Sequence, residues 1–170
     1  MAVGRGVESP QAAVVVTRRS AGLLLYRKVA GGIEVLLAHP GGPLWAKRDE
    51  GAWTVPKGEI EAGERPVDVA RREFAEETGH PPPDGELRPL GEVQQKSGKV
   101  VVAWALRGDL DAGTAQSNTF PLEWPPGSGN WKDVPEIDRF EWFAPDEARR
   151  RLNPAQTPFV DRLEKVLETG

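Results

Sequence analysis

The segment from Gly58 to His80 reads GEIEAGERPVDVARREFAEETGH, and its second half carries the clearest helix signals in the chain. Pro66 suits the first turn of a helix, and Gly79 stands where a C-terminal cap belongs. Apolar side chains recur between them at helical spacing, namely Val67, Ala70 and Phe74. The spacing predicts an amphipathic helix over 66–79 that packs one face against a core.

Three carboxylates share another face of this predicted helix. Glu73, Glu76 and Glu77 stand at i, i+3 and i+4, so they fall within an arc of roughly 100°. Like charges at this spacing repel, and Arg72 neutralises only part of the cluster. Oxygen ligands gathered on one rigid face suit Mg²⁺, Mn²⁺ or Ca²⁺. The alternative is a solvated acidic face in which Arg72 pairs with Glu76.

The wider spacing distinguishes these two interpretations. The segment resembles the Nudix box, the signature of the Nudix hydrolase superfamily, whose pattern is GX5EX7REUXEEXGU with U a bulky aliphatic residue. All seven fixed positions match: Gly58, Glu64, Arg72, Glu73, Glu76, Glu77 and Gly79. Phe74 and His80 stand where the aliphatic residues are usual. A match of this length has a small chance of arising at random.

The resemblance implies a metal site built by the box. It assigns the binding of a divalent cation, Mg²⁺ with Mn²⁺ as a possible substitute, to Glu73, Glu76 and Glu77. The main-chain carbonyl of Gly58 often joins them in the family. For Glu64 and Arg72 the resemblance implies an ion pair with a structural role, and Gly79 ends the helix.

Two residues outside the box are further catalytic candidates. The run from Trp53 to Gly58 is similar to the one that precedes the box in MutT-like and diadenosine-polyphosphate-cleaving members, which makes Lys57 a candidate phosphate contact. Many members also supply a glutamate before the last strand, and Glu136 is the nearest candidate by spacing. Glu77 and Glu136 therefore both remain candidates for the general base.

The substrate side of the site is expected in the loops. Lys47 and Arg48 precede the box and could meet the far end of a phosphate chain, which favours dinucleoside polyphosphates or nucleoside triphosphates. Four aromatic residues are candidates to stack on a nucleobase, namely Trp45, Phe120, Trp124 and Trp131. Their alternative role is as core or loop anchors.

The resemblance implies a metal-dependent pyrophosphohydrolase that cleaves a nucleoside diphosphate linked to another group. The alternative is a Nudix-like module that binds a nucleotide without cleaving it. Other catalytic signatures are missing, since the chain has no Walker-type loop and no dinucleotide fingerprint, and its two histidines lack metal-ligand spacing. We expect a small-molecule nucleotide as the partner, no stable nucleic-acid or membrane binding, and a monomer or homodimer.

The remaining sequence predicts a mixed α/β architecture. We expect strands over 13–17, 21–26, 33–38, 100–106 and 140–143, with 21–26 and 33–38 forming a hairpin, a weaker strand over 87–93, and a turn-rich loop over 108–132. Helices are expected over 145–152 and 158–167. The resemblance implies the α/β Nudix fold, a mixed β-sheet sandwiched between helices. We expect a flexible tail over 1–12 and one domain over 13–170.

Composition narrows the chemistry further. The chain has 170 residues, no cysteine and a net charge of −4, so thiolate chemistry is excluded and a cytoplasmic location is expected. The segment 58–80 holds seven acidic and three basic residues and thus carries a net charge equal to that of the whole chain. Bound divalent cations would offset this charge, so an acidic total is compatible with a phosphate-bearing substrate.

Overall fold

The fold is described for residues 17–169 of a computed structural model. The predicted tail over 1–12 and nearly all of the predicted strand over 13–17 lie outside the described residues. The main sheet has the order β4-β5-β1-β2-β8, with β3 paired to β1. The strands of this sheet are β1 (Arg19–Val29), β2 (Gly32–Pro40), β3 (Lys57–Glu59), β4 (Arg88–Gln94), β5 (Val100–Arg107) and β8 (Ile137–Phe143).

The sheet is mixed because β1 runs parallel to β5 and antiparallel to β2 and β3. The predicted hairpin is confirmed, since β1 and β2 pair with Tyr26 opposite Val35 and turn at Gly31 with a positive φ of 86°. The weak strand signal around Leu90 is also borne out by β4, which pairs antiparallel with β5.

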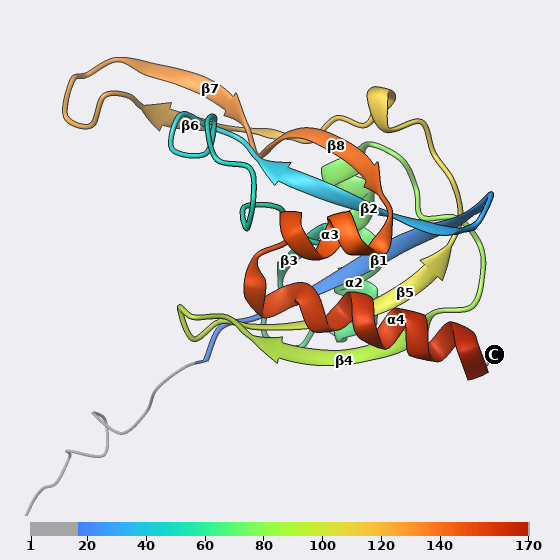
Figure 1. The fold of residues 1–170 in the computed structure, drawn as a ribbon. Coiled ribbons are helices and arrows are strands. Elements are labelled where there is room, and N and C mark those ends of the chain that lie inside the picture. The colour runs from blue at the N-terminus through green and yellow to red at the C-terminus, as the bar shows by residue number, and fades with distance from the viewer. Residues whose placement is uncertain (1–16, 170) are drawn as a thin grey trace, which may run out of the picture.

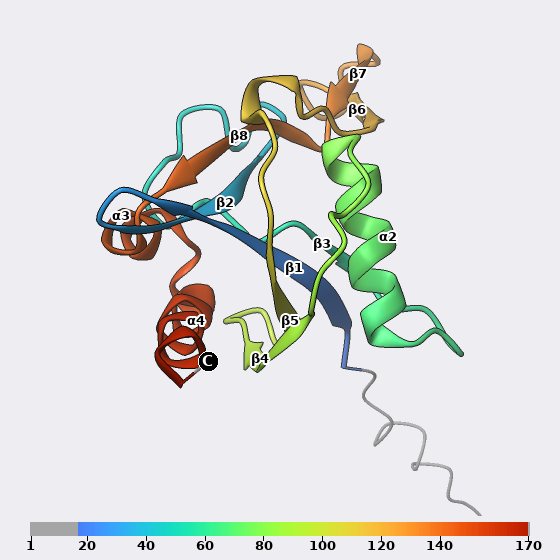
Figure 2. The same cartoon turned by 90° about the vertical axis from the view of Figure 1, so that its right-hand side faces the viewer.

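Helices cover both faces of the sheet, as Figures 1 and 2 show. Helix α2 (Pro66–Thr78) lies on one face, and α3 (Pro145–Arg151) and α4 (Thr157–Thr169) lie on the other. Two short 3₁₀ turns, η1 (Ala112–Thr114) and η2 (Pro154–Gln156), connect elements. The architecture is therefore the predicted α/β/α sandwich, and all three predicted helices are present.

The two faces enclose separate hydrophobic clusters. Alternate residues of β1 belong to the two clusters in turn, because successive side chains of a strand point to opposite faces of the sheet. Leu23 and Leu25 pack with Phe74 of α2, whereas Leu24 and Tyr26 pack with Phe159 of α4. Between 17 and 169 we find no helix of the length and apolar character that a membrane crossing requires.

Helix α2 has the predicted bounds and a slightly rotated buried face. Its buried residues are Val69, Ala70, Phe74 and Thr78, whereas Val67 is only half-buried. The helix ends at Gly79, which has a left-handed conformation (φ 75°) and donates its N–H to the carbonyl of Ala75.

The prediction of a turn-rich loop over 108–132 is wrong in part. Strands β6 (Thr119–Glu123) and β7 (Trp131–Pro135) form a separate two-stranded hairpin that projects from the body (Figure 1). Phe120 pairs with Val134, and Trp131 pairs with Glu123. The sequence signal was weak because Pro121 and Pro135 interrupt the strand pattern.

Candidate active site

The carboxylates of α2 lie beside β3, with Glu77 the most deeply placed. Its Oε1 accepts the main-chain N–H of Lys57 at 3.2 Å. Burial is the main cause that raises the pKa of Glu77 to about 8, and the positive charge of Lys57 opposes this rise. The repulsive charge of Glu73 adds to it. Burial and the neighbouring acidic charges thus disfavour the ionised form of this carboxyl group.

Glu73 lies against the backbone of Gly58. A Cβ placed on Gly58 would come within 2.1 Å of Cδ and Oε1 of Glu73, so only glycine leaves the carboxylate where it is. The pKa of Glu73 is raised, mainly by burial and then by the charge of Glu76. Main chain and carboxylate are thus in direct contact at the point where the family resemblance implies a metal.

Arg72 joins the loop to the helix. Its guanidinium donates to the carboxylate of Glu64 and lies 3.5 Å from Glu73 and 3.3 Å from Glu76. Glu64 also accepts the N–H of Glu61 at 2.7 Å. The arrangement contains both the predicted Glu64 pair and the alternative Glu76 pair. Because Arg72 is about half exposed, its attraction for the acids is screened by water.

Glu136 lies between β7 and β8, and its charge raises the pKa of both Glu73 and Glu77. The fold thereby brings a residue distant in sequence to the carboxylates of α2. Its main chain is held from two sides, by the N–H of Gly41 on its carbonyl and by its own N–H on Asn118, each at 2.9 Å.

The donors suit a hard divalent cation. They are carboxylate oxygens in a segment with excess negative charge. The carboxyl groups of Glu73 and Glu77 have raised pKa values, and Glu73 lies against the backbone of Gly58, which has no side chain. Within 17–169, however, no three acidic, histidine or cysteine side chains converge on one point, so no complete metal cage is preformed. Part of the charge is instead balanced by Arg72.

A second cation that the sequence did not indicate lies near Lys57. Burial lowers the pKa of Lys57, and the positive charge of Lys99 lowers it further, while Glu77 and Glu59 act in the opposite sense. Lys99 follows the turn between β4 and β5. The buried hydroxyl of Ser20, opposite Glu59 in the sheet, has no hydrogen-bond partner. Only the pairing of β1 with β3 and β5 brings these residues together, so no local pattern could reveal them.

The family model for the NUDIX domain matches residues 9–163. The chain belongs to the Nudix hydrolase family. A curated relative, the asymmetrical bis(5'-nucleosyl)-tetraphosphatase of Caenorhabditis elegans, is 44% identical over 59 residues, which are 35% of this chain and 38% of the relative. The match thus spans well under half of the relative's length.

Solved Nudix structures share the fold across nearly the whole chain. A C. elegans Ap4A hydrolase binary complex has a TM-score of 0.63 at 22% identity and covers 89% of this chain and 99% of its own. The NUDIX domain of Shewanella oneidensis NrtR, complexed with ADP ribose, has a TM-score of 0.61 at 15% identity and covers 92% of each chain. At these identities the likeness concerns the fold alone.

The loop before the Nudix box carries three of the predicted substrate contacts. Lys47 and Arg48 are exposed, and the Arg48 guanidinium lies 5.3 Å from the ring centroid of Trp45. Trp45 itself packs against the hydrophobic cluster on the α3 and α4 face, which is the face opposite α2. The structure therefore does not bring the ring of Trp45 to the carboxylates of α2.

The other aromatic candidates lie on the projecting hairpin of the Nudix domain. Trp124 is half-buried and donates its main-chain N–H to Asn130, while Trp131 is 64% exposed. Phe120 is half-buried in β6. None of these side chains touches the acidic groups of the box through a hydrogen bond in the described residues.

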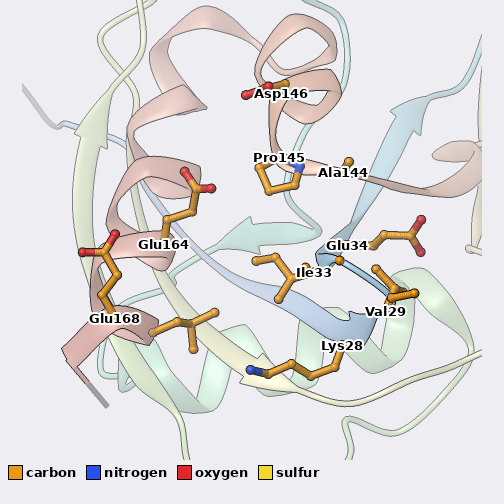
Figure 3. A pocket seen from close by; sticks show the side chains of 13 residues that line it. Lys28, Val29, Ile33, Glu34, Ala144, Pro145, Asp146, Glu164 and Glu168 are labelled. Atoms are coloured by element: carbon orange, nitrogen blue, oxygen red, sulfur yellow. The ribbon is translucent and has the colours of Figure 1, made fainter.

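A pocket of the Nudix domain lies elsewhere, between the β1–β2 turn, the start of α3 and the end of α4 (Figure 3). It has a volume of about 650 Å³ and contains no predicted site residue. Asp146 and Glu164, two of its acids, already pair with Arg149. This pocket is therefore separate from the carboxylates of α2.

Proposed function

We propose that this chain is a metal-dependent pyrophosphohydrolase that cleaves a nucleoside diphosphate linked to a second group, with dinucleoside polyphosphates and nucleoside triphosphates as the substrate classes. The observation that supports the proposal is electrostatic: the charges of Glu73, Glu136 and Lys57 all act on Glu77, and the charge of Lys99 acts on Lys57. The named activity of the C. elegans relative supports the dinucleoside polyphosphate class.

Glu73, Glu76, Glu77 and the carbonyl of Gly58 are the proposed holders of Mg²⁺, for which Mn²⁺ can substitute. When bound, the cation supplies Lewis-acid polarisation of a phosphate oxygen and activation of water. The pKa of Glu77 is raised to about 8, so cation binding at neutral pH should release a proton from this group. The excess negative charge of the Nudix box favours the binding of this cation.

The proposed reaction also needs a group that accepts a proton from water and cations that neutralise the substrate's phosphates. Water attacks phosphorus, the bridging P–O bond breaks, and the proton of the water passes to a carboxylate, for which Glu136 and Glu77 are the candidates. Glu136 is exposed and its charge acts on Glu73 and Glu77, which suits a group that must exchange its proton with solvent. Lys57 and Lys99 are the proposed residues that neutralise the phosphate chain.

A nucleotide panel with product identification tests this function. Full-length protein with Mg²⁺ is given diadenosine tetraphosphate, nucleoside triphosphates, ADP-ribose and NADH. We expect cleavage within the phosphate chain, with ATP and AMP as products of the tetraphosphate. Tight nucleotide binding in Mg²⁺ without any turnover would instead establish a binding module and reject the proposal.

Paired variants separate the candidate bases. Glu136→Gln should lower kcat by about 10²-fold or more if this residue accepts the proton, whereas Glu77→Gln should also weaken Mg²⁺ binding. Asp133→Asn is the matched control, because Asp133 is an exposed acid on β7 close to Glu136 in sequence. Unchanged kcat in both glutamine variants would contradict the roles of these two residues.

A further inference from the structure

His39 of β2 is fully buried, and both of its ring nitrogens face oxygen atoms. Nδ1 lies 2.9 Å from Oδ1 of Asp138, and Nε2 lies 2.6 Å from the main-chain oxygen of Arg48. Neither the Nudix box nor the proposed reaction uses this residue.

The two partners fix the charge that the ring must carry. A carbonyl oxygen can only accept, so Nε2 carries a hydrogen. The carboxylate of Asp138 also accepts, so Nδ1 carries one as well. A ring with two N–H groups is an imidazolium, and its burial is compatible with charge because an anion is bonded to it. Arg139 is the residue opposite His39 in β8, and its guanidinium lies 5.2 Å from the ring centroid of Trp53.

The pairing of β2 with β8 contains a β-bulge beside the His39–Asp138 pair. His39 is paired with Arg139 and Pro40 with Ile137, so Asp138 is the extra residue of a bulge and has no partner in β2. Bulges redirect a side chain away from the regular alternation of a strand. The irregularity thus accounts for Asp138 facing the buried ring beside it. The Trp53 ring closes the other side, at a centroid distance of 5.1 Å from His39.

The residues bonded by His39 belong to two segments, one of which carries Glu136. Arg48 lies in the loop 41–51, and Asp138 lies two residues after Glu136. The same loop begins at Gly41, which donates its N–H to the carbonyl of Glu136 at 2.9 Å. A Cβ on Gly41 would come within 2.0 Å of the carbonyl oxygen of Pro135, so the two segments are in close contact.

We propose that His39 is a positioning residue that, as a buried imidazolium, holds the loop 41–51 in register with the segment that carries Glu136. The kinetic part of this proposal rests on the proposed function, whereas the charge and the fixing of the loop do not. Its effect is to keep the cationic residues Lys47 and Arg48 and the carboxylate of Glu136 on one rigid frame.

NMR of the full-length chain labelled with ¹⁵N-histidine tests the charge directly. The chain has two histidines, so His80→Gln assigns both sets of ring signals. At neutral pH we expect both nitrogens of His39 to resonate as protonated nitrogens. In Asp138→Asn, which removes the anion at a site that is 29% exposed, one of them should lose its proton. An unprotonated nitrogen in the unsubstituted chain would overturn the proposal.

Two further measurements on Asp138→Asn test the positioning. Amide hydrogen exchange over 42–48 should become faster, and kcat for diadenosine tetraphosphate with Mg²⁺ should fall about tenfold, as for the loss of one charge-assisted bond. His80→Gln, whose ring bonds only the Thr114 hydroxyl among the described residues, should change neither. Unchanged exchange would overturn the proposal. A chain without hydrolase activity would refute the proposed function, while the NMR and exchange results would still decide the role of His39.

Discussion

The carboxyl group of Glu73 lies directly on the α-carbon of Gly58, so close that a methyl group at this position would come within 2.1 Å of it. This contact joins β3 to α2 at the centre of the proposed metal site. It gives a physical reason for glycine here, because a larger residue would move the carboxylate rather than the backbone.

Gly58→Ala should therefore impair metal binding more than stability. The methyl group meets the flexible end of Glu73, which can turn away at little cost to the fold. We expect the affinity for Mg²⁺, measured by isothermal titration, to fall about tenfold, with a small change in Tm. Gly113→Ala is the control, since its Cβ would come no closer than 3.3 Å to Asp111. Equal affinity in the Gly58 variant and its control would show that the contact does not shape the site.

Metal binding should depend on pH through Glu77. Its pKa is raised from 4.5 to about 8 in the folded chain, so the folded state binds more protons than the unfolded state between these values. Without metal, stability should fall as pH rises through this window. Mg²⁺ binds the carboxylate, so its apparent affinity should rise up to about pH 8 with release of a proton.

Titrations in buffers of different ionisation enthalpy measure that proton release. Glu77→Gln removes the group and should abolish its share of the pH dependence. If Mg²⁺ binding to the unsubstituted chain released no proton between pH 6 and about 8, the buried state of Glu77 would be refuted.

Lys99 should contribute to substrate binding although it is remote from the box in sequence. Lys99→Met removes a positive charge next to Lys57 and should raise KM for a phosphate-rich substrate about tenfold. It should also raise the pKa of Lys57, because the repulsion between the two ammonium groups is lost. Lys132→Met, at an exposed position of β7, is the control. An unchanged KM would place Lys99 outside the substrate site.

A buried glutamine should prove important for stability. Gln156 of η2 accepts the N–H of Val55 at 2.9 Å and donates to Thr54 and Gln95. Gln156→Leu leaves the buried N–H of Val55 without a partner, which should cost about 1–3 kcal/mol in urea unfolding. Gln116→Leu, at an exposed position, should change stability by much less. A Gln156 variant as stable as the control would mean that water replaces the lost acceptor.

The helix of the box could be predicted from local sequence because its determinants are local. Pro66, the apolar spacing and Gly79 act within one helix, and α2 has those bounds. The hairpin of β1 and β2 was equally predictable, since the paired glycines at its turn suit a positive φ. The resemblance of the box to the Nudix signature extended this local information to the architecture of the sheet and helices.

The site could be predicted only in part. Glu73, Glu76 and Glu77 share a helix face by spacing alone. The nearness of Glu136 to these carboxylates and of Lys99 to Lys57 depends instead on the pairing of strands that are distant in sequence. The same reason explains the placement of Trp45, because the sequence does not say which face of the sheet a loop aromatic will cover. The projecting hairpin was missed because prolines mask its strands.

The sequence by itself determined the helix, the acidic cluster and the family, since each depends on spacings of a few residues. Tertiary structure alone decided that Glu73 rests on Gly58, that the charge of Lys99 acts on Lys57 and that His39 bonds both Arg48 and Asp138. These contacts join segments far apart in the chain. They arise because packing the two faces of one sheet fixes the relative positions of loops that share no local signal.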